Sequence, residues 1–111
     1  MKEGDIVLTP VPQANGQIKN RPALFLREMP PFNDALVCGI STQLHQQVAG
    51  FDEIITQQDA EFSTSGLVSD SLIRLGFLAL IPRSQIIGSI GSITSARHKR
   101  LLTNLSDYLL K

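Results

Sequence analysis

The chain has 111 residues, with ten basic and ten acidic side chains and no net charge at pH 7. This length fits one domain with a modest core, and the charge balance excludes binding to nucleic acid through overall positive charge. Any affinity for RNA must therefore come from a local basic patch. The single cysteine, Cys38, excludes an intrachain disulfide framework and a cysteine-rich metal site. Because Cys38 lies in an apolar run, we expect it to be a small, buried hydrophobic residue.

The most prominent feature of the N-terminal part is a predicted hairpin. Residues 5–9 and 23–26 are short runs of apolar and β-branched residues, which are typical of strands. The segment 10–20 between them is rich in Pro, Gln, Asn and Gly and predicts a long, mobile loop. Arg21 lies just before the second strand, and its spacing alone favours a solvated residue at a strand end.

In the middle of the chain, short strands alternate with polar connections. Residues 35–40 predict a third strand, with Gly39 as a candidate bulge. Residues 44–49 predict a short helical turn or a loop, and residues 52–56 predict a weak strand. The polar segment 57–65 predicts a loop or a surface turn.

Three further apolar segments precede the C-terminal region. Residues 71–75 predict a buried strand that carries Arg74. Residues 77–81 are ambiguous between strand and helix because the run is short. In residues 84–93 apolar and small residues alternate, and two glycines predict strong bending, as at the corner of a small barrel.

The C-terminal region contains the clearest predicted helix. Thr94 or Ser95 fits as its N-cap, and apolar residues then recur at helical spacing. The apolar stripe comprises Leu101, Leu102, Leu105, Leu109 and Tyr108, and the opposite side carries Arg97, Lys99, Arg100, Asn104 and Asp107. We expect the basic run around His98 to be a solvated face, with a contact to phosphate or a partner as the alternative.

Together these elements predict a mainly β protein, in which one C-terminal helix packs on a strongly bent antiparallel sheet. We expect a single domain over residues 1–111. The N-terminus lacks the features of a signal peptide, and no apolar run is long enough to span a bilayer. We therefore expect a cytoplasmic protein that does not contact the membrane.

Several segments, taken in order, carry a resemblance to a known family. They are Gly4-Asp5-Ile6-Val7, Lys19-Asn20-Arg21-Pro22-Ala23-Leu24, Cys38-Gly39-Ile40-Ser41-Thr42-Gln43, the stretch from Ser65 to Arg74, and Ile90-Gly91 before the final helix. In sequence these segments resemble the opening, the third strand and the central strand of the MazF/PemK toxins of bacterial toxin–antitoxin pairs. No single segment is specific, but their shared order covers nearly the whole chain.

This resemblance implies an SH3-like barrel with added helices and a specific activity. The family's toxins cleave single-stranded RNA at selected sequences, without a metal or another cofactor, and are neutralised by an antitoxin. Their RNA groove lies across the interface of a homodimer. By resemblance, the residues expected to take part in catalysis are Arg21, Ser41 and Arg74, and those expected to bind substrate are Thr42, Gln43 and Ser71.

These residue types suit RNA cleavage without a metal. The 2′-hydroxyl attacks the adjacent phosphorus, and negative charge grows on the phosphoryl oxygens. The guanidinium of an arginine can hold two of these oxygens, and neighbouring hydroxyl and amide donors complete the anion site. The less specific alternatives are that Ser41 and Thr42 simply end a strand, and that Arg74 forms a structural pair with Asp5, Asp34 or Asp70.

The chain also departs from the family pattern. Many relatives carry an acidic residue two positions after the central-strand arginine, where this chain has Gly76. His45 or Glu53 are the candidates to replace that acid, although no spacing argument supports either. The alternative function is therefore a catalytically degenerate barrel that binds DNA, RNA or a peptide, and a third is inhibition of another target, such as a topoisomerase.

Overall fold

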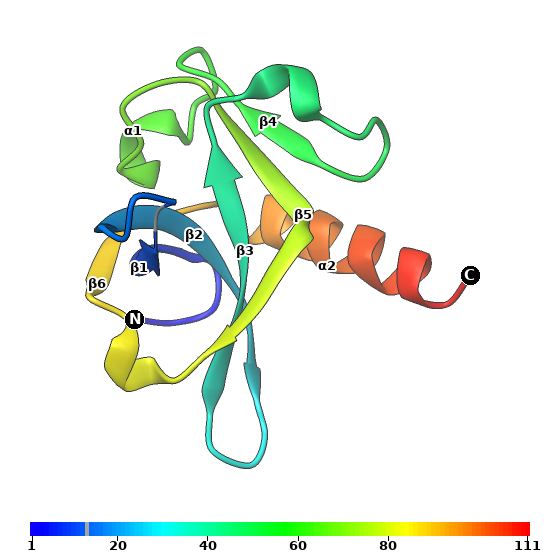
Figure 1. The fold of residues 1–111 in the computed structure, drawn as a ribbon. Coiled ribbons are helices and arrows are strands. Elements are labelled where there is room, and N and C mark those ends of the chain that lie inside the picture. The colour runs from blue at the N-terminus through cyan, green and yellow to red at the C-terminus, as the bar shows by residue number, and fades with distance from the viewer. Residues whose placement is uncertain (13) are drawn as a thin grey trace.

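A computed structural model describes residues 1–12 and 14–111 of the chain. Six strands form one antiparallel sheet in the order β4-β5-β3-β2-β1-β6, which curls on itself, and a long C-terminal helix crosses behind it (Figure 1). The longer elements are β1 (Asp5–Pro12), β2 (Ile18–Met29), β3 (Asp34–Ser41), β5 (Ser71–Ile81) and α2 (Ser95–Leu109). The shorter ones are η1 (Leu44–Gln46), β4 (Glu53–Ile55), α1 (Phe62–Ser65), η2 (Arg83–Gln85) and β6 (Gly88–Ser92). The predicted fold class, a bent antiparallel sheet with a C-terminal helix, is confirmed.

The first hairpin is longer than its composition predicts. β1 and β2 remain paired up to Pro12 and Ile18, so the expected loop over residues 10–20 is wrong at both ends. Gln13 lies outside the described residues. Among the described strands, β1 pairs beyond Leu8 with β2 alone, and a proline is tolerated there because an edge strand does not need every N–H. Pairing of the backbone extended the strands where the side chains gave no strand signal.

β5 is one strand with a bulge at its centre, and not the two separate segments that we expected. Arg74 pairs with Gly39 and Leu78 pairs with Cys38, so three residues of β5, 75–77, lie between two consecutive pairs. The bulge withdraws the N–H of Leu75 from the ladder. The buried Asp52 carboxylate accepts a hydrogen bond from this N–H at 3.0 Å and another from Val48 N–H at 2.9 Å.

The main core lies between the sheet and α2. Leu101 and Leu105 of the helix are buried against Leu24, Ile73 and other apolar residues of the sheet. Cys38 is fully buried in the same cluster, as predicted from its apolar neighbours. Burial, with a smaller effect from the charge of Asp52, raises the pKa of the Cys38 thiol to about 12. The thiol therefore stays protonated at neutral pH.

The start of α2 is more buried than its charges suggest. Thr94 is the N-cap, and its hydroxyl accepts the N–H of Arg97 at 3.2 Å, as expected. Arg97 itself, however, is buried, so its assignment to the solvated side is wrong. His98 is also partly buried, with its Nε2 2.7 Å from the carbonyl oxygen of Leu26. At the other end of the helix, Tyr108 and Leu109 are exposed, so the apolar stripe does not continue to that end.

Arg97 is buried at the centre of a cluster of carboxylates from two other elements. Its guanidinium contacts Glu53 of β4 at 2.8 Å, Glu61 at 2.6 Å and Asp59 at 3.6 Å. Glu61 lies at the start of α1, a short helix within the segment that we expected to be a loop or surface turn. Periodicity in α2 could not reveal this burial, since the partner carboxylates come from segments over 35 residues earlier in the chain.

No helix in the described part of the chain is long and apolar enough to cross a bilayer.

Candidate functional site

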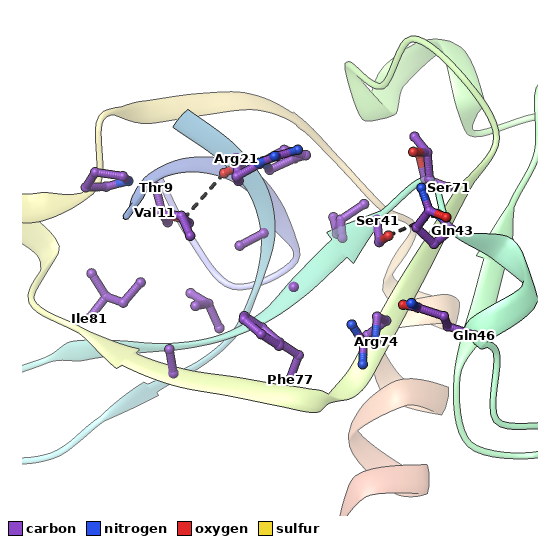
Figure 2. Close-up of a pocket in the computed structure, with 18 residues that line it drawn as sticks. Thr9, Val11, Arg21, Ser41, Gln43, Gln46, Ser71, Arg74, Phe77 and Ile81 are labelled. Carbon is purple, nitrogen blue, oxygen red and sulfur yellow. Dashed lines mark hydrogen bonds between the residues drawn. The ribbon is translucent and has the colours of Figure 1, made fainter. Parts of the chain in front are cut away.

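The principal groove of the molecule has a volume of about 690 Å³ and lies on the open face of the curled sheet (Figure 2). Its walls come from β1, β2, β3 and β5, together with the turn after β3. Because these strands are neighbours in the sheet, segments as far apart in sequence as residues 9 and 81 line one space. The groove contains all six residues expected to act in catalysis or substrate binding: Arg21, Ser41, Thr42, Gln43, Ser71 and Arg74.

Arg21 lies on the wall made by the first hairpin. It belongs to β2, pairs with Thr9 of β1, and is exposed. The Thr9 hydroxyl donates a hydrogen bond to the carbonyl oxygen of Arg21 at 3.4 Å. The arginine backbone is thus held within a paired ladder, while its side chain reaches the groove (Figure 2).

Ser41, Thr42 and Gln43 form a tight turn where β3 ends. The Ser41 hydroxyl oxygen accepts the N–H of Gln43 at 3.0 Å, and the Thr42 carbonyl accepts the N–H of Leu44 at 3.0 Å. A serine hydroxyl has one proton to donate, and this proton is still available when the oxygen accepts a hydrogen bond. In this turn, therefore, Ser41 can donate to an anion in the groove while its own orientation is fixed by Gln43.

Ser71 lies at the start of β5 and differs from Ser41 in its hydrogen bonding. It is buried, and its hydroxyl donates to the carbonyl oxygen of Ser69 at 2.8 Å. Because its only hydroxyl proton is used, Ser71 retains no proton for a phosphoryl oxygen. This geometry suits Ser71 to shaping the groove more than to donating into it.

Arg74 is half-buried on β5, and its guanidinium carbon lies 5.7 Å from the centroid of the Phe77 ring. In the described ranges no ion pair links Arg74 to Asp5, Asp34 or Asp70, so the structural pairing considered for it is wrong. Asp70 instead accepts the N–H of Gln57, and Asp5 accepts the N–H of Lys2.

The groove has the electrostatics of an anion site. Among the described residues that line it are two arginines, four hydroxyl side chains and two glutamines, but no carboxylate and no histidine. Hydroxyls and amides offer neutral donors beside the two fixed charges, an arrangement that suits phosphate. A guanidinium donates hydrogen bonds and has no acceptor atom, so Arg21 and Arg74 are suited to bind the anion and not to serve as the base.

The residues considered as replacements for the missing acid lie elsewhere. Glu53 binds Arg97 and Arg100, and His45 is absent from the described lining of the groove. Gly76 is exposed on the β5 bulge, and a Cβ built there would meet no atom within 4 Å. The backbone thus has room for a side chain at the position where the resemblance leads us to expect an acid.

Sequence reasoning missed Thr9, Gln46 and Phe77 as lining residues. Thr9 was assigned to the first strand without a function, and Phe77 to a segment of ambiguous type. The pairing of β1 with β2 brings Thr9 to the groove, the bulge of β5 brings Phe77, and η1 after the end of β3 brings Gln46. Over residues 1–12 and 14–111, no group of three or more His, Cys, Asp and Glu side chains is placed to hold a metal ion.

Comparison with known proteins gives one family and one fold. The family model of PemK-like, MazF-like toxins of type II toxin–antitoxin systems matches residues 2–109. Among solved structures, the chain is similar to the toxin MazF-mt6 of Mycobacterium tuberculosis, with a TM-score of 0.66 and 19% identity over 95% of each chain. At that identity the likeness shows a shared fold. A search of curated proteins found no match.

Proposed function

This chain belongs to the family of PemK-like, MazF-like toxins of type II toxin–antitoxin systems, and we propose that it is an endoribonuclease whose active site is the groove of Arg21 and Arg74. Its substrate is single-stranded RNA, cleaved at selected sequences in the cytoplasm, and an antitoxin restrains it. The observation that supports this proposal best is the composition of the groove, in which two arginines and several neutral donors line one space without a carboxylate.

In the proposed reaction, the 2′-oxygen of one nucleotide forms a bond to the adjacent phosphorus while the bond from phosphorus to the 5′-oxygen breaks. The products are a 2′,3′-cyclic phosphate and a 5′-hydroxyl. Arg21 holds the phosphoryl oxygens as charge grows on them, and Arg74 and the Ser41 hydroxyl complete the anion site. Thr42 and Gln43, both exposed beside Ser41, contact the flanking nucleotide.

Two proton transfers accompany these bond changes. One proton leaves the 2′-hydroxyl and another reaches the departing 5′-oxygen. Since the described lining holds no carboxylate or histidine, these protons pass through water in the groove or through a group of a second subunit. The proposed active form is a homodimer, in which exposed apolar side chains such as Leu78 and Leu80 become covered.

The test is cleavage of one RNA by wild type, Arg21→Ala, Arg21→Lys and Arg74→Ala. We expect Arg21→Ala to lose about two to three orders of magnitude in rate, the usual cost of one preorganised donor to the transition state. Arg21→Lys should also be badly impaired, because an ammonium cannot hold two oxygens in a fixed geometry. A chelator should leave the rate unchanged.

The control is Arg27→Ala, which removes another exposed arginine of β2. Arg27 binds Glu3 at 3.1 Å and lies outside the described lining of the groove. Its variant should cleave RNA as wild type does, and circular dichroism should show that all variants are folded. Equal cleavage by wild type and folded Arg21→Ala would remove Arg21 from the mechanism.

The second candidate function is a degenerate barrel that binds nucleic acid or a peptide without cleavage. It is favoured by one observation, the absence of an acid both at Gly76 and in the described groove lining. Binding of RNA without cleavage by wild type, together with cleavage by Gly76→Glu, would support this candidate. The open space around the Gly76 Cβ position makes the substitution sterically feasible.

A further inference from the structure

Phe77 is an aromatic side chain that is only partly buried in the folded chain. It is 54% exposed although it lines the principal groove. An exposed phenylalanine forgoes much of the free energy that burial of its ring would release. Phe77 therefore offers an apolar planar surface to a ligand that is already held in the groove by its phosphates.

The bulge of β5 brings Phe77 and Arg74 into the same groove. In a regular strand, residues three positions apart project to opposite faces of the sheet. Because residues 75–77 have no partners in β3, the alternation is reset between Arg74 and Leu78. Both side chains therefore line the groove, with the guanidinium carbon 5.7 Å from the ring centroid (Figure 2).

Gly39 of β3 lies against the Phe77 ring, and a side chain at this position would collide with the ring. A Cβ on Gly39 would lie 2.8 Å from Cδ1 of Phe77, closer than real Cβ contacts allow. The missing side chain lets the ring rest directly on the β3 backbone. One side of the ring thus rests on the sheet, the Arg74 guanidinium lies over the ring with its carbon 5.7 Å from the centroid, and the surface that remains exposed lines the groove.

We propose that Phe77, supported by Gly39 and flanked by Arg74, is a stacking site for one nucleobase of a single-stranded RNA bound in the groove. This inference rests on the proposed function and specifies how the site binds its substrate. Stacking on an aromatic ring accepts any base, since every base has a π-face, whereas the arginines bind phosphate. The site therefore raises the affinity for RNA and fixes the position of one base in the groove. Selectivity for particular bases comes from the hydrogen-bonding side chains around it.

The test measures binding of a short single-stranded RNA that carries 2′-O-methyl groups, so that it is not cleaved. We expect Phe77→Leu, which keeps apolar volume but removes the π-face, to weaken binding about 10-fold or more. Phe77→Tyr should bind as wild type does. The slope of log Kd against log salt should stay the same in Phe77→Leu but become shallower in Arg21→Ala, because only the second variant loses a phosphate contact.

Single abasic positions in the same RNA identify the stacked base. In wild type, removal of one base should weaken binding about as much as Phe77→Leu does. In Phe77→Leu, removal of that base should have no further effect. Gly39→Ala displaces the ring, so the double variant of Gly39→Ala and Phe77→Leu should bind hardly more weakly than Phe77→Leu alone.

The matched control is Phe32→Leu, the same substitution at another exposed phenylalanine. Phe32 lies in the turn between β2 and β3, outside the described lining of the groove. This variant should bind the RNA as wild type does. Equal binding by wild type and Phe77→Leu would overturn the stacking site while leaving the proposed function intact.

Two other outcomes also decide against the inference. If Phe77→Leu changes the subunit association measured by sedimentation, Phe77 is a contact between copies of the chain or with a peptide. If wild type binds no RNA and cleaves none, the proposed function and the stacking site fail together. Cleavage assays on unmodified RNA separate this last outcome from a failure caused by the 2′-O-methyl groups.

Discussion

Two regions of the molecule use arginine in opposite ways. At the start of α2, Arg97 is buried and contacts three carboxylates, one from β4 and two from the segment that ends at the N-cap of α1. In the groove, Arg21 and Arg74 lie beside hydroxyls and amides, in a described lining without any carboxylate. A buried charge must be matched by the protein itself, whereas a charge on a groove wall can be matched by an anionic ligand. The contrast separates an arginine that stabilises the fold from arginines suited to bind phosphate.

The comparison predicts that Arg97→Ala has the largest effect on stability. Removing one member of a buried ion pair costs about 3–5 kcal/mol, because the charge left behind loses its partner. Here Glu61 is the largely buried carboxylate that loses Arg97, whereas Glu53 still contacts Arg100. Arg21→Ala and Arg74→Ala should cost less, about 1 kcal/mol at most, because Arg21 is exposed and Arg74 is half-buried with a cation–π contact to Phe77. Denaturant melts of the three variants measure both effects. A stability loss for Arg21→Ala equal to that for Arg97→Ala would erase the distinction between the two regions.

Leu105→Ala measures the apolar contribution at the same helix. Leu105 is buried in the core cluster between α2 and the sheet, so its truncation should cost about 2–5 kcal/mol. Comparison with Arg97→Ala then shows whether ion pairs or apolar packing hold α2 more firmly. A loss below about 1 kcal/mol would mean that the helix is not docked as the structure has it.

The smallest expected effect is the change with pH in the stability difference between wild type and Glu61→Gln, and it reports on one carboxylate. Partial burial alone would raise the pKa of Glu61, but hydrogen bonds from Thr94 and Arg97 and the charge of Arg97 outweigh it and lower the pKa below its ordinary 4.5. A carboxylate with a lowered folded pKa stabilises the protein above the unfolded pKa, and loses that contribution as pH falls through the folded pKa. The stability difference between wild type and Glu61→Gln should therefore be constant near neutral pH and shrink below pH 4.5.

Denaturant melts of both proteins at several pH values check this expectation. Glu28→Gln is a suitable control, since Glu28 forms an exposed ion pair with Arg83 that does not involve α2. Its stability difference from wild type should be small, as for exposed ion pairs in general. A difference for Glu61→Gln that grows with acid would show that Glu61 is not stabilised as a carboxylate.

Much of the fold and of the candidate site was predictable because it depends on local patterns. The third strand, the C-terminal helix with Thr94 as N-cap and the burial of Cys38 all follow from neighbouring residues and are confirmed. The six candidate site residues were expected from the resemblance to the MazF/PemK toxins and not from local patterns alone, and the structure places them in one groove. Their chemical roles remain predictions for the Arg21 and Arg74 variants to test.

The amino-acid sequence by itself determined the third strand, the C-terminal helix with its apolar stripe around Leu101 and Leu105, and the presence of arginines beside hydroxyl residues. The tertiary structure decided which cations are buried and which face the groove. Arg97 meets Glu53 and Glu61 across more than 35 residues, and Phe77 reaches the groove only because β5 bulges against β3. Both outcomes depend on pairing between distant segments, and periodicity along one segment carries no information about the charge or register of another.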